Sequence, residues 1–258
     1  MGKIVAVTNQ KGGVGKTTTA VNLAASLGAL GKNVLLVDID PQGNATSGFG
    51  VNKRAVDSSS YEVVLGIQKV EQSIQPTAFQ GVSILPASID LAGAELELVS
   101  LERREYRLRD ALIQVKKQYD YLLIDCPPSL GLLTLNGLNA ADTVLIPIQC
   151  EYYALEGLSQ LMSSVRSVKH LYNPTIDVEG VLITMYDARL NITTQVVEEV
   201  KKFFPQKVFS TVIPRNVRLS EAPSYGKPAR FYDATSKGAI AYDELAKEFI
   251  ERNEKGQE

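Results

Sequence analysis

Short apolar segments alternate with amphipathic segments along most of this chain. Near-continuous apolar runs predict buried strands at residues 4–8, 34–37, 82–85, 121–124, 144–148, 181–185 and 208–213. Apolar residues at helical spacing predict helices at residues 17–30, 103–118, 155–171, 193–204 and 239–253. Apolar strands that alternate with helices are typical of a mostly parallel β-sheet covered by helices on both faces.

No repeat, low-complexity linker or clear boundary interrupts this alternation. We therefore predict an α/β fold in which residues 1–258 form a single domain, a size that can bury a substantial core. Residues 57–60 are the most polar interruption, and we expect a surface loop there.

The charge balance changes the picture of possible partners. The chain has 27 Lys and Arg against 29 Asp and Glu, a formal net charge of −2, which excludes a protein that coats nucleic acid through bulk positive charge. Residues 166–230 nevertheless carry a net charge of +4, which leaves −6 for the remainder. A local basic face is therefore compatible with the composition.

Cysteine and histidine are too scarce for several kinds of site. The chain has two cysteines, Cys126 and Cys150, which we expect to be buried thiols, and one histidine, His170, which we expect at the surface. A zinc site or a Ser-His-Asp triad has little to be built from. No signal peptide and no apolar stretch near 18 residues is present, so we expect a cytoplasmic protein that does not use a membrane.

The strongest motif follows the first predicted strand, where residues 10–18 read QKGGVGKTT. A strand, a glycine-rich loop and a helix are the context of a phosphate-binding loop, or P-loop, in which backbone N–H groups surround phosphate oxygens. Lys16 would hold the β- and γ-phosphates, and the hydroxyl group of Thr17 would bind Mg²⁺. Gln10 replaces the usual first glycine, and a second lysine, Lys11, follows it.

Carboxylates follow two of the predicted strands. Asp125 ends an apolar strand in a Walker B pattern, in which the carboxylate reaches Mg²⁺. Asp38 and Asp40 follow another strand, and strands that end together place these side chains beside the P-loop. One of them could orient the attacking water, or the two could be a structural pair, and the spacing alone does not distinguish these alternatives.

Residues 11–18 form the deviant Walker A motif KGGVGKTT, and with the tracts at 38–44 and 125–129 the chain resembles the ParA/MinD family of P-loop ATPases. Further tracts at 151–157, 184–187 and 213–218 are similar to the chromosomal ParA subgroup called Soj. The resemblance implies a deviant-Walker-A P-loop NTPase fold, with ATP and Mg²⁺ as cofactors. It also implies an ATP-sandwich homodimer that binds double-stranded DNA without sequence preference, is nucleoid-associated when ATP-bound, and is released when a ParB-type partner stimulates hydrolysis.

The resemblance also implies roles for individual residues. Lys11 matches the lysine that crosses to the partner's nucleotide, Asp40 matches the carboxylate needed for hydrolysis, and Gly12 lies where the subunits approach. Expected catalytic residues are Lys11, Lys16 and Asp40. Expected nucleotide contacts are Lys11, Gly12, Gly13, Val14, Gly15, Lys16, Thr17, Thr18, Pro214 and Asn216. Thr17 and Asp125 are the expected metal-binding residues, and Arg189 and Arg218 match arginines that bind DNA.

Two other functions compete with this interpretation. A MinD-like division-site ATPase would bind membrane through a basic amphipathic C-terminal helix, which the polar, acidic tail at residues 251–258 does not resemble. A nucleotide-dependent regulator of transcription or replication with negligible turnover is the other alternative, and ATPase activity would distinguish it.

Overall fold

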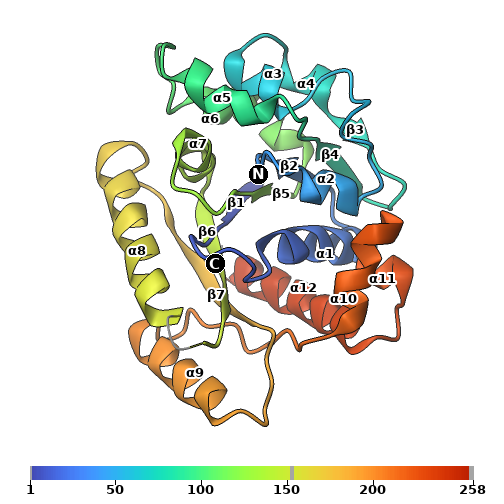
Figure 1. Cartoon of the computed structure of the whole chain (residues 1–258), viewed down its shortest axis with the longest axis vertical. Coiled ribbons are helices and arrows are strands. Elements are labelled where there is room, and N and C mark those ends of the chain that lie inside the picture. The colour runs from blue at the N-terminus through green and yellow to red at the C-terminus, as the bar shows by residue number, and fades with distance from the viewer. Residues whose placement is uncertain (1, 152–153, 256–258) are drawn as a thin grey trace.

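The computed structural model describes residues 2–151 and 154–255. Within these residues seven strands form one sheet, in the order β3-β4-β2-β5-β1-β6-β7 (Figure 1). The strands are β1 Lys3–Val7, β2 Val34–Asp38, β3 Gln75–Pro76, β4 Val82–Leu85, β5 Tyr121–Asp125, β6 Thr143–Gln149 and β7 Asp177–Thr184. All neighbours pair in parallel except the short β3, which runs antiparallel to β4. The predicted fold class is confirmed.

Helices cover both faces of the sheet because its central strands are apolar on both sides. In β1, Ile4 and Ala6 belong to one buried cluster, and Val5 and Val7 belong to the other. The first face carries α3 Ser60–Leu65, α4 Val70–Ser73, α5 Leu91–Leu98, α6 Arg107–Val115, α7 Leu132–Ala140, α8 Ala154–Leu171 and α9 Asn191–Phe203. The second carries α1 Lys16–Ala29, α2 Asn44–Gly48, α10 Val217–Glu221, α11 Ala229–Tyr232 and α12 Lys237–Lys255. Two short 3-10 turns, η1 Lys116–Gln118 and η2 Ala222–Tyr225, complete the set.

The prediction of a strand at residues 208–213 is wrong. This segment lies along β7 and makes only isolated bridges, between Val181 and Val208 and between Tyr186 and Pro214. The Glu248 side chain on α12 accepts the backbone N–H groups of the two intervening residues 210 and 211, at 2.7 and 2.8 Å. Because these two N–H groups donate to Glu248, they do not contribute to a continuous ladder with β7.

The polar tract at residues 57–60 is also not a simple surface loop. Ser58, Ser59 and Ser60 are all buried. The Ser59 hydroxyl caps α3 by accepting the N–H of Tyr61, and the Glu62 side chain accepts the N–H of Ser59 in return. This capping box explains why serines tolerate burial at the start of a helix that the apolar pattern did not reveal.

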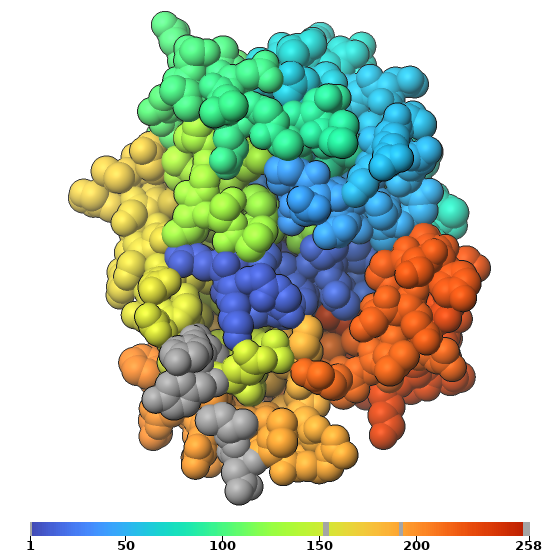
Figure 2. All heavy atoms as spheres, in the orientation of Figure 1, coloured from blue at the N-terminus to red at the C-terminus, as the bar shows by residue number. Residues whose placement is uncertain are grey.

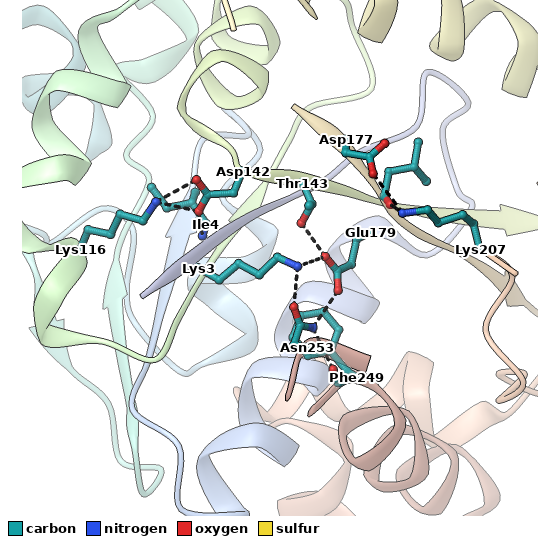
Figure 3. A network of polar contacts seen from close by, with 11 residues as sticks. Lys3, Ile4, Lys116, Asp142, Thr143, Asp177, Glu179, Lys207, Phe249 and Asn253 are labelled. Carbon is teal, nitrogen blue, oxygen red and sulfur yellow. Dashed lines mark hydrogen bonds and ion pairs between the residues drawn. The ribbon is translucent and has the colours of Figure 1, made fainter. Parts of the chain in front are cut away.

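The amino-terminal ends of the central strands carry a network of paired charges (Figure 3). Lys3 of β1 contacts Glu179 of β7 and Asn253 of α12, both at 2.5 Å. Glu179 also accepts hydrogen bonds from Asn253 at 2.7 Å and Thr143 at 2.6 Å. Three strands and the last helix are thus fastened together at this edge.

The remaining expectations concern single residues. Cys126 and Cys150 are buried thiols, as predicted, and His170 is exposed in the last turn of α8. Within the described ranges, no helix combines the length and apolar character that a membrane span requires.

Candidate nucleotide-binding site

The glycine-rich loop lies at the carboxyl end of β1 and opens directly into α1. Gly13 and Gly15 have φ angles of +75° and +88°, in the left-handed region that glycine adopts without strain. A Cβ atom built on Gly12 or Gly13 would meet no atom within 4 Å, so the loop faces open space. In Figure 2 the N-terminal segment, in blue, reaches the surface at the middle of the face shown. The loop therefore has the shape of an anion cradle at a helix N-terminus.

The two loop lysines lie in different environments. Lys16 is 7% exposed, and its Nζ donates to the carbonyl oxygen of Lys11 at 3.1 Å. Burial lowers the pKa of Lys16, while Asp125 and Asp40 favour its charged form. The Lys11 ammonium group lies at the molecular surface, where it pairs with Glu151. One lysine thus faces the interior acids, and the other is available at the surface.

Asp125 is the least satisfied buried group of the site. It is fully buried, and neither carboxylate oxygen has a hydrogen-bond partner among the residues that the structure describes. Burial raises its pKa well above the usual range, as does the charge of Asp38, its cross-strand neighbour in β2. The nearby Thr17 hydroxyl favours the charged form of Asp125 but does not outweigh burial. An unpartnered buried carboxylate beside a P-loop threonine fits a bound Mg²⁺ completed by phosphates and water.

Asp38 and Asp40, which the sequence left as alternatives, have different surroundings. Asp38 is fully buried and accepts the Thr46 hydroxyl at 2.6 Å, with two backbone N–H groups. Burial raises the pKa of Asp38 to about 6. Asp40 is 7% exposed, and its side chain accepts the N–H of Gln42 at 2.9 Å. Asp38 therefore anchors α2, and Asp40 has the freer carboxylate.

A cavity of about 390 Å³ continues from the P-loop toward the C-terminal helices. Pro214 and Asn216, the predicted adenine contacts, line it together with Gly15 and Thr18 of the P-loop. The other lining residues are Thr184, Met185, Ile213, Arg215, Leu219, Ser220, Pro223 and Tyr242. The structure thus brings the predicted base and phosphate contacts to one continuous surface.

Arg189 and Arg218 do not lie inside this cavity. Arg189 follows β7 and has a side chain that is 88% exposed, and Arg218 lies on the short helix α10 with a half-exposed side chain. Both are paired with carboxylates of the same chain. They are surface groups at the ends of the two segments that line the cavity.

Sequence reasoning missed residues that support the loop. Asn9, 3% exposed, accepts the N–H of Lys11 and donates to the carbonyl oxygen of Pro147, which ties the loop to β6. The Thr184 hydroxyl donates to the carbonyl oxygen of Val14 at 2.8 Å, which ties it to β7. A polar residue at the carboxyl end of an apolar strand is the signal that could have identified both.

Comparisons with known proteins agree with this geometry. A family model described as an AAA domain matches residues 2–178. The chain is 60% identical over 248 residues to the sporulation initiation inhibitor protein Soj of Bacillus subtilis, covering 96% of this chain and 98% of that protein. It is 54% identical over 253 residues to the chromosome partitioning protein ParA of Myxococcus xanthus, covering 98% and 89%. The structure of cobyrinic acid a,c-diamide synthase from Mycobacterium smegmatis with bound ATP analog and magnesium matches with a TM-score of 0.87 and 39% identity, covering 99% of this chain and 97% of that one.

Proposed function

Because this chain belongs to the ParA and Soj family of chromosome-partitioning ATPases, we propose that it is an ATP-gated DNA clamp that opens on hydrolysis. The clamp is a sandwich homodimer that holds double-stranded DNA without sequence preference. A ParB-type partner stimulates hydrolysis and releases the DNA. The protein is then cytoplasmic, and associated with the nucleoid while ATP is bound.

The different positions of the two loop lysines, one buried and one at the surface, are the main support for the proposal. Lys16 is buried beside Asp125 and Asp40, so it holds the β- and γ-phosphates of its own nucleotide. Lys11 lies at the surface, where its ion pair with the exposed Glu151 is weak and can be exchanged for the nucleotide of a second subunit. A positive charge supplied in trans would stabilise the transition state as an arginine finger does.

The other site residues complete a single cradle. Thr17 and Asp125 hold Mg²⁺, which supplies positive charge that offsets the phosphates when it is bound. The backbone of residues 12–15 and the Thr18 side chain bind phosphate oxygens, while Pro214 and Asn216 receive the adenine. Asp40 orients the attacking water, because its carboxylate accepts only one hydrogen bond in the described structure, whereas Asp38 holds Thr46.

The coupling between nucleotide and DNA follows from dimerisation. Gly12 is exposed with open space around it, so a second subunit can approach the loop closely there. Two protomers double the number of Arg189 and Arg218 contacts to DNA, and affinity rises steeply with the number of phosphate contacts. ATP-dependent pairing therefore acts as the DNA-binding switch.

The test is DNA binding measured with ATP, with ADP and without nucleotide across a salt series. We expect tight binding only with ATP, much weaker binding with ADP or without nucleotide, and an affinity that falls steeply as salt rises. Asp40→Ala should remain bound to DNA with ATP because it does not hydrolyse the nucleotide. Gly12→Val should bind ATP but should not dimerise, so it should bind DNA only as weakly as a single protomer does. Equal DNA affinity in all three nucleotide conditions would refute the switch.

A further inference from the structure

The Arg189 guanidinium group binds the carboxylate of Asp187 with the same paired geometry by which an arginine binds a phosphate. Its Nε and one terminal nitrogen donate to the two oxygens of Asp187, at 2.9 and 2.7 Å. The backbone N–H of Arg189 donates to the same carboxylate at 3.1 Å. Paired donation to two oxygens is also the geometry with which arginine binds phosphate. Asp187 and a DNA phosphate would therefore compete for the same donors.

Arg218 is held by two carboxylates. Its guanidinium group lies 2.7 Å from Glu221 of α10 and 3.3 Å from Asp233, which follows α11. The Tyr232 hydroxyl also donates to Glu221, at 3.3 Å, and this contact helps to fix that carboxylate. With two acids around one arginine, these three side chains have a net charge of −1, so the positive charge of Arg218 is offset within a single protomer.

Arg189 and Arg218, with the acids that pair with them, lie close in sequence to the two segments that line the cavity at Pro214 and Asn216. Tyr186 bridges to Pro214: the N–H of Tyr186 donates to the carbonyl oxygen of residue 213 at 2.9 Å, and its carbonyl oxygen accepts the N–H of residue 215 at 3.4 Å. Arg189 lies three residues beyond Tyr186, and Arg218 lies four residues beyond Pro214. The side chain of Asn216, in the cavity wall, accepts the backbone N–H of Arg218 and so caps α10. The arginines and the acids that hold them thus belong to one unit.

We propose that Asp187, Glu221 and Asp233 set the DNA affinity of the protein by competing with DNA phosphates for Arg189 and Arg218. The competition lowers the affinity of a single protomer, so that DNA is retained only when two protomers present their arginines together. Exposed ion pairs are weak, so phosphates displace the carboxylates once several contacts form at the same time. This inference rests on the proposed DNA-binding function and identifies the residues that adjust it.

The test uses the full chain with Asp187→Asn, Glu221→Gln and Asp233→Asn combined. These changes keep side-chain size and remove the competing charge. We expect binding of a random-sequence DNA duplex, measured by fluorescence anisotropy with ADP, to become about tenfold tighter than in the wild type, at two- to fivefold per arginine. The same gain should occur in the Gly12→Val background, and the dependence of affinity on salt should become steeper.

A matched control removes the same charge elsewhere. Glu71→Gln, Glu102→Gln and Glu251→Gln combined neutralise three exposed acids that contact neither arginine in the described structure. This control should change DNA affinity less than twofold. An equal gain in the control would overturn the proposal, because net charge alone would then explain the effect. Weaker binding by the test variant would also overturn it, since the acids would then orient the arginines.

The outcomes also separate this inference from the function on which it rests. ATP-dependent DNA binding by the wild type, with no change in the test variant, overturns the inference alone. No DNA binding by either protein with ATP overturns the proposed function and the inference together. Melting temperatures of all variants establish that each is folded under the assay conditions.

Discussion

A carboxylate is buried at each of the two edges of the sheet where its strands begin and end, but in the described structure only the carboxylate at the amino-terminal edge is paired with donors. At the amino-terminal edge, Glu179 has a side chain that is 4% exposed and is paired with Lys3, Thr143 and Asn253 (Figure 3). At the carboxyl edge, Asp125 is fully buried, and neither of its oxygens has a partner within residues 2–151 and 154–255. β1 connects the two edges, since Lys3 begins it and the P-loop follows it.

This difference separates buried charges that stabilise the fold from buried charges that are suited to binding a ligand. A buried carboxylate with a full set of donors stabilises the elements that supply them. A buried carboxylate without donors costs stability, and that cost is recovered only when something positive binds. Each prediction below tests whether one edge serves structure and the other serves binding.

The largest effect is expected for Lys16→Ala at the carboxyl edge. Removing the charge-assisted contacts to two phosphates should weaken ATP binding by about 100-fold or more, roughly 3 kcal/mol. Isothermal titration calorimetry measures the affinity, with Lys32→Ala as the control, since Lys32 is a partly exposed lysine that pairs with Glu254 and its removal should leave ATP binding unchanged. Retained tight binding in Lys16→Ala would contradict the P-loop assignment.

Glu179→Gln should have its effect on stability alone. Loss of the charge that faces Lys3 should lower the free energy of unfolding by about 2 kcal/mol, because it breaks a largely buried ion pair. Urea denaturation measures this change, and ATP affinity should not change. Weakened ATP binding in a folded Glu179→Gln protein would show that the two edges are not separable.

Asp125→Asn makes the same chemical change at the opposite edge and should have the opposite sign. Removing a buried carboxyl group whose pKa is raised by burial should raise the free energy of unfolding by about 1 kcal/mol without nucleotide. Magnesium-dependent ATP turnover should be lost in the same variant. A destabilised Asp125→Asn protein would mean that this carboxylate has a structural role like that of Glu179.

The smallest effect is the pH dependence of stability. The pKa of Asp38 is about 6 in the folded protein, above the ordinary value of 3.8, so the folded state holds this proton more tightly than the unfolded chain does. Stability from this group is complete below about pH 4 and is lost as the pH rises through 6. Between pH 5 and 7 the free energy of unfolding should fall by about 1 kcal/mol without nucleotide. Asp38→Asn should remove this slope, and a rise in stability over the same range would contradict it.

Much of the fold was predictable because it depends on local pattern. Six of the seven predicted strands exist, since each is an apolar run that is buried on both faces. The segment 208–213 has a similar pattern, but its pairing depends on Glu248, which lies more than 30 residues away in the sequence. No periodicity within the segment could show that a distant side chain takes its donors.

The candidate site was predictable as a set of residues but not as an arrangement. The motif at residues 11–18 located the cradle, and the ends of β2 and β5 located the acids. The different surroundings of Asp38 and Asp40 depend on Thr46, which α2 brings back to the sheet, and the apolar pattern did not reveal α2.

The burial of both cysteines makes the chain well suited to site-specific chemical labelling. Burial raises the pKa of Cys150 to about 11 and raises that of Cys126 as well. A cysteine introduced at an exposed position has a pKa near 8.5, so its thiolate fraction at pH 7 is about 300 times that of Cys150. A dye on a cysteine introduced at an exposed position outside the glycine-rich loop would therefore label that position selectively, without removing either native thiol and without a side chain at Gly12. Energy transfer between two such dyes would follow the opening and closing of the assembly in real time.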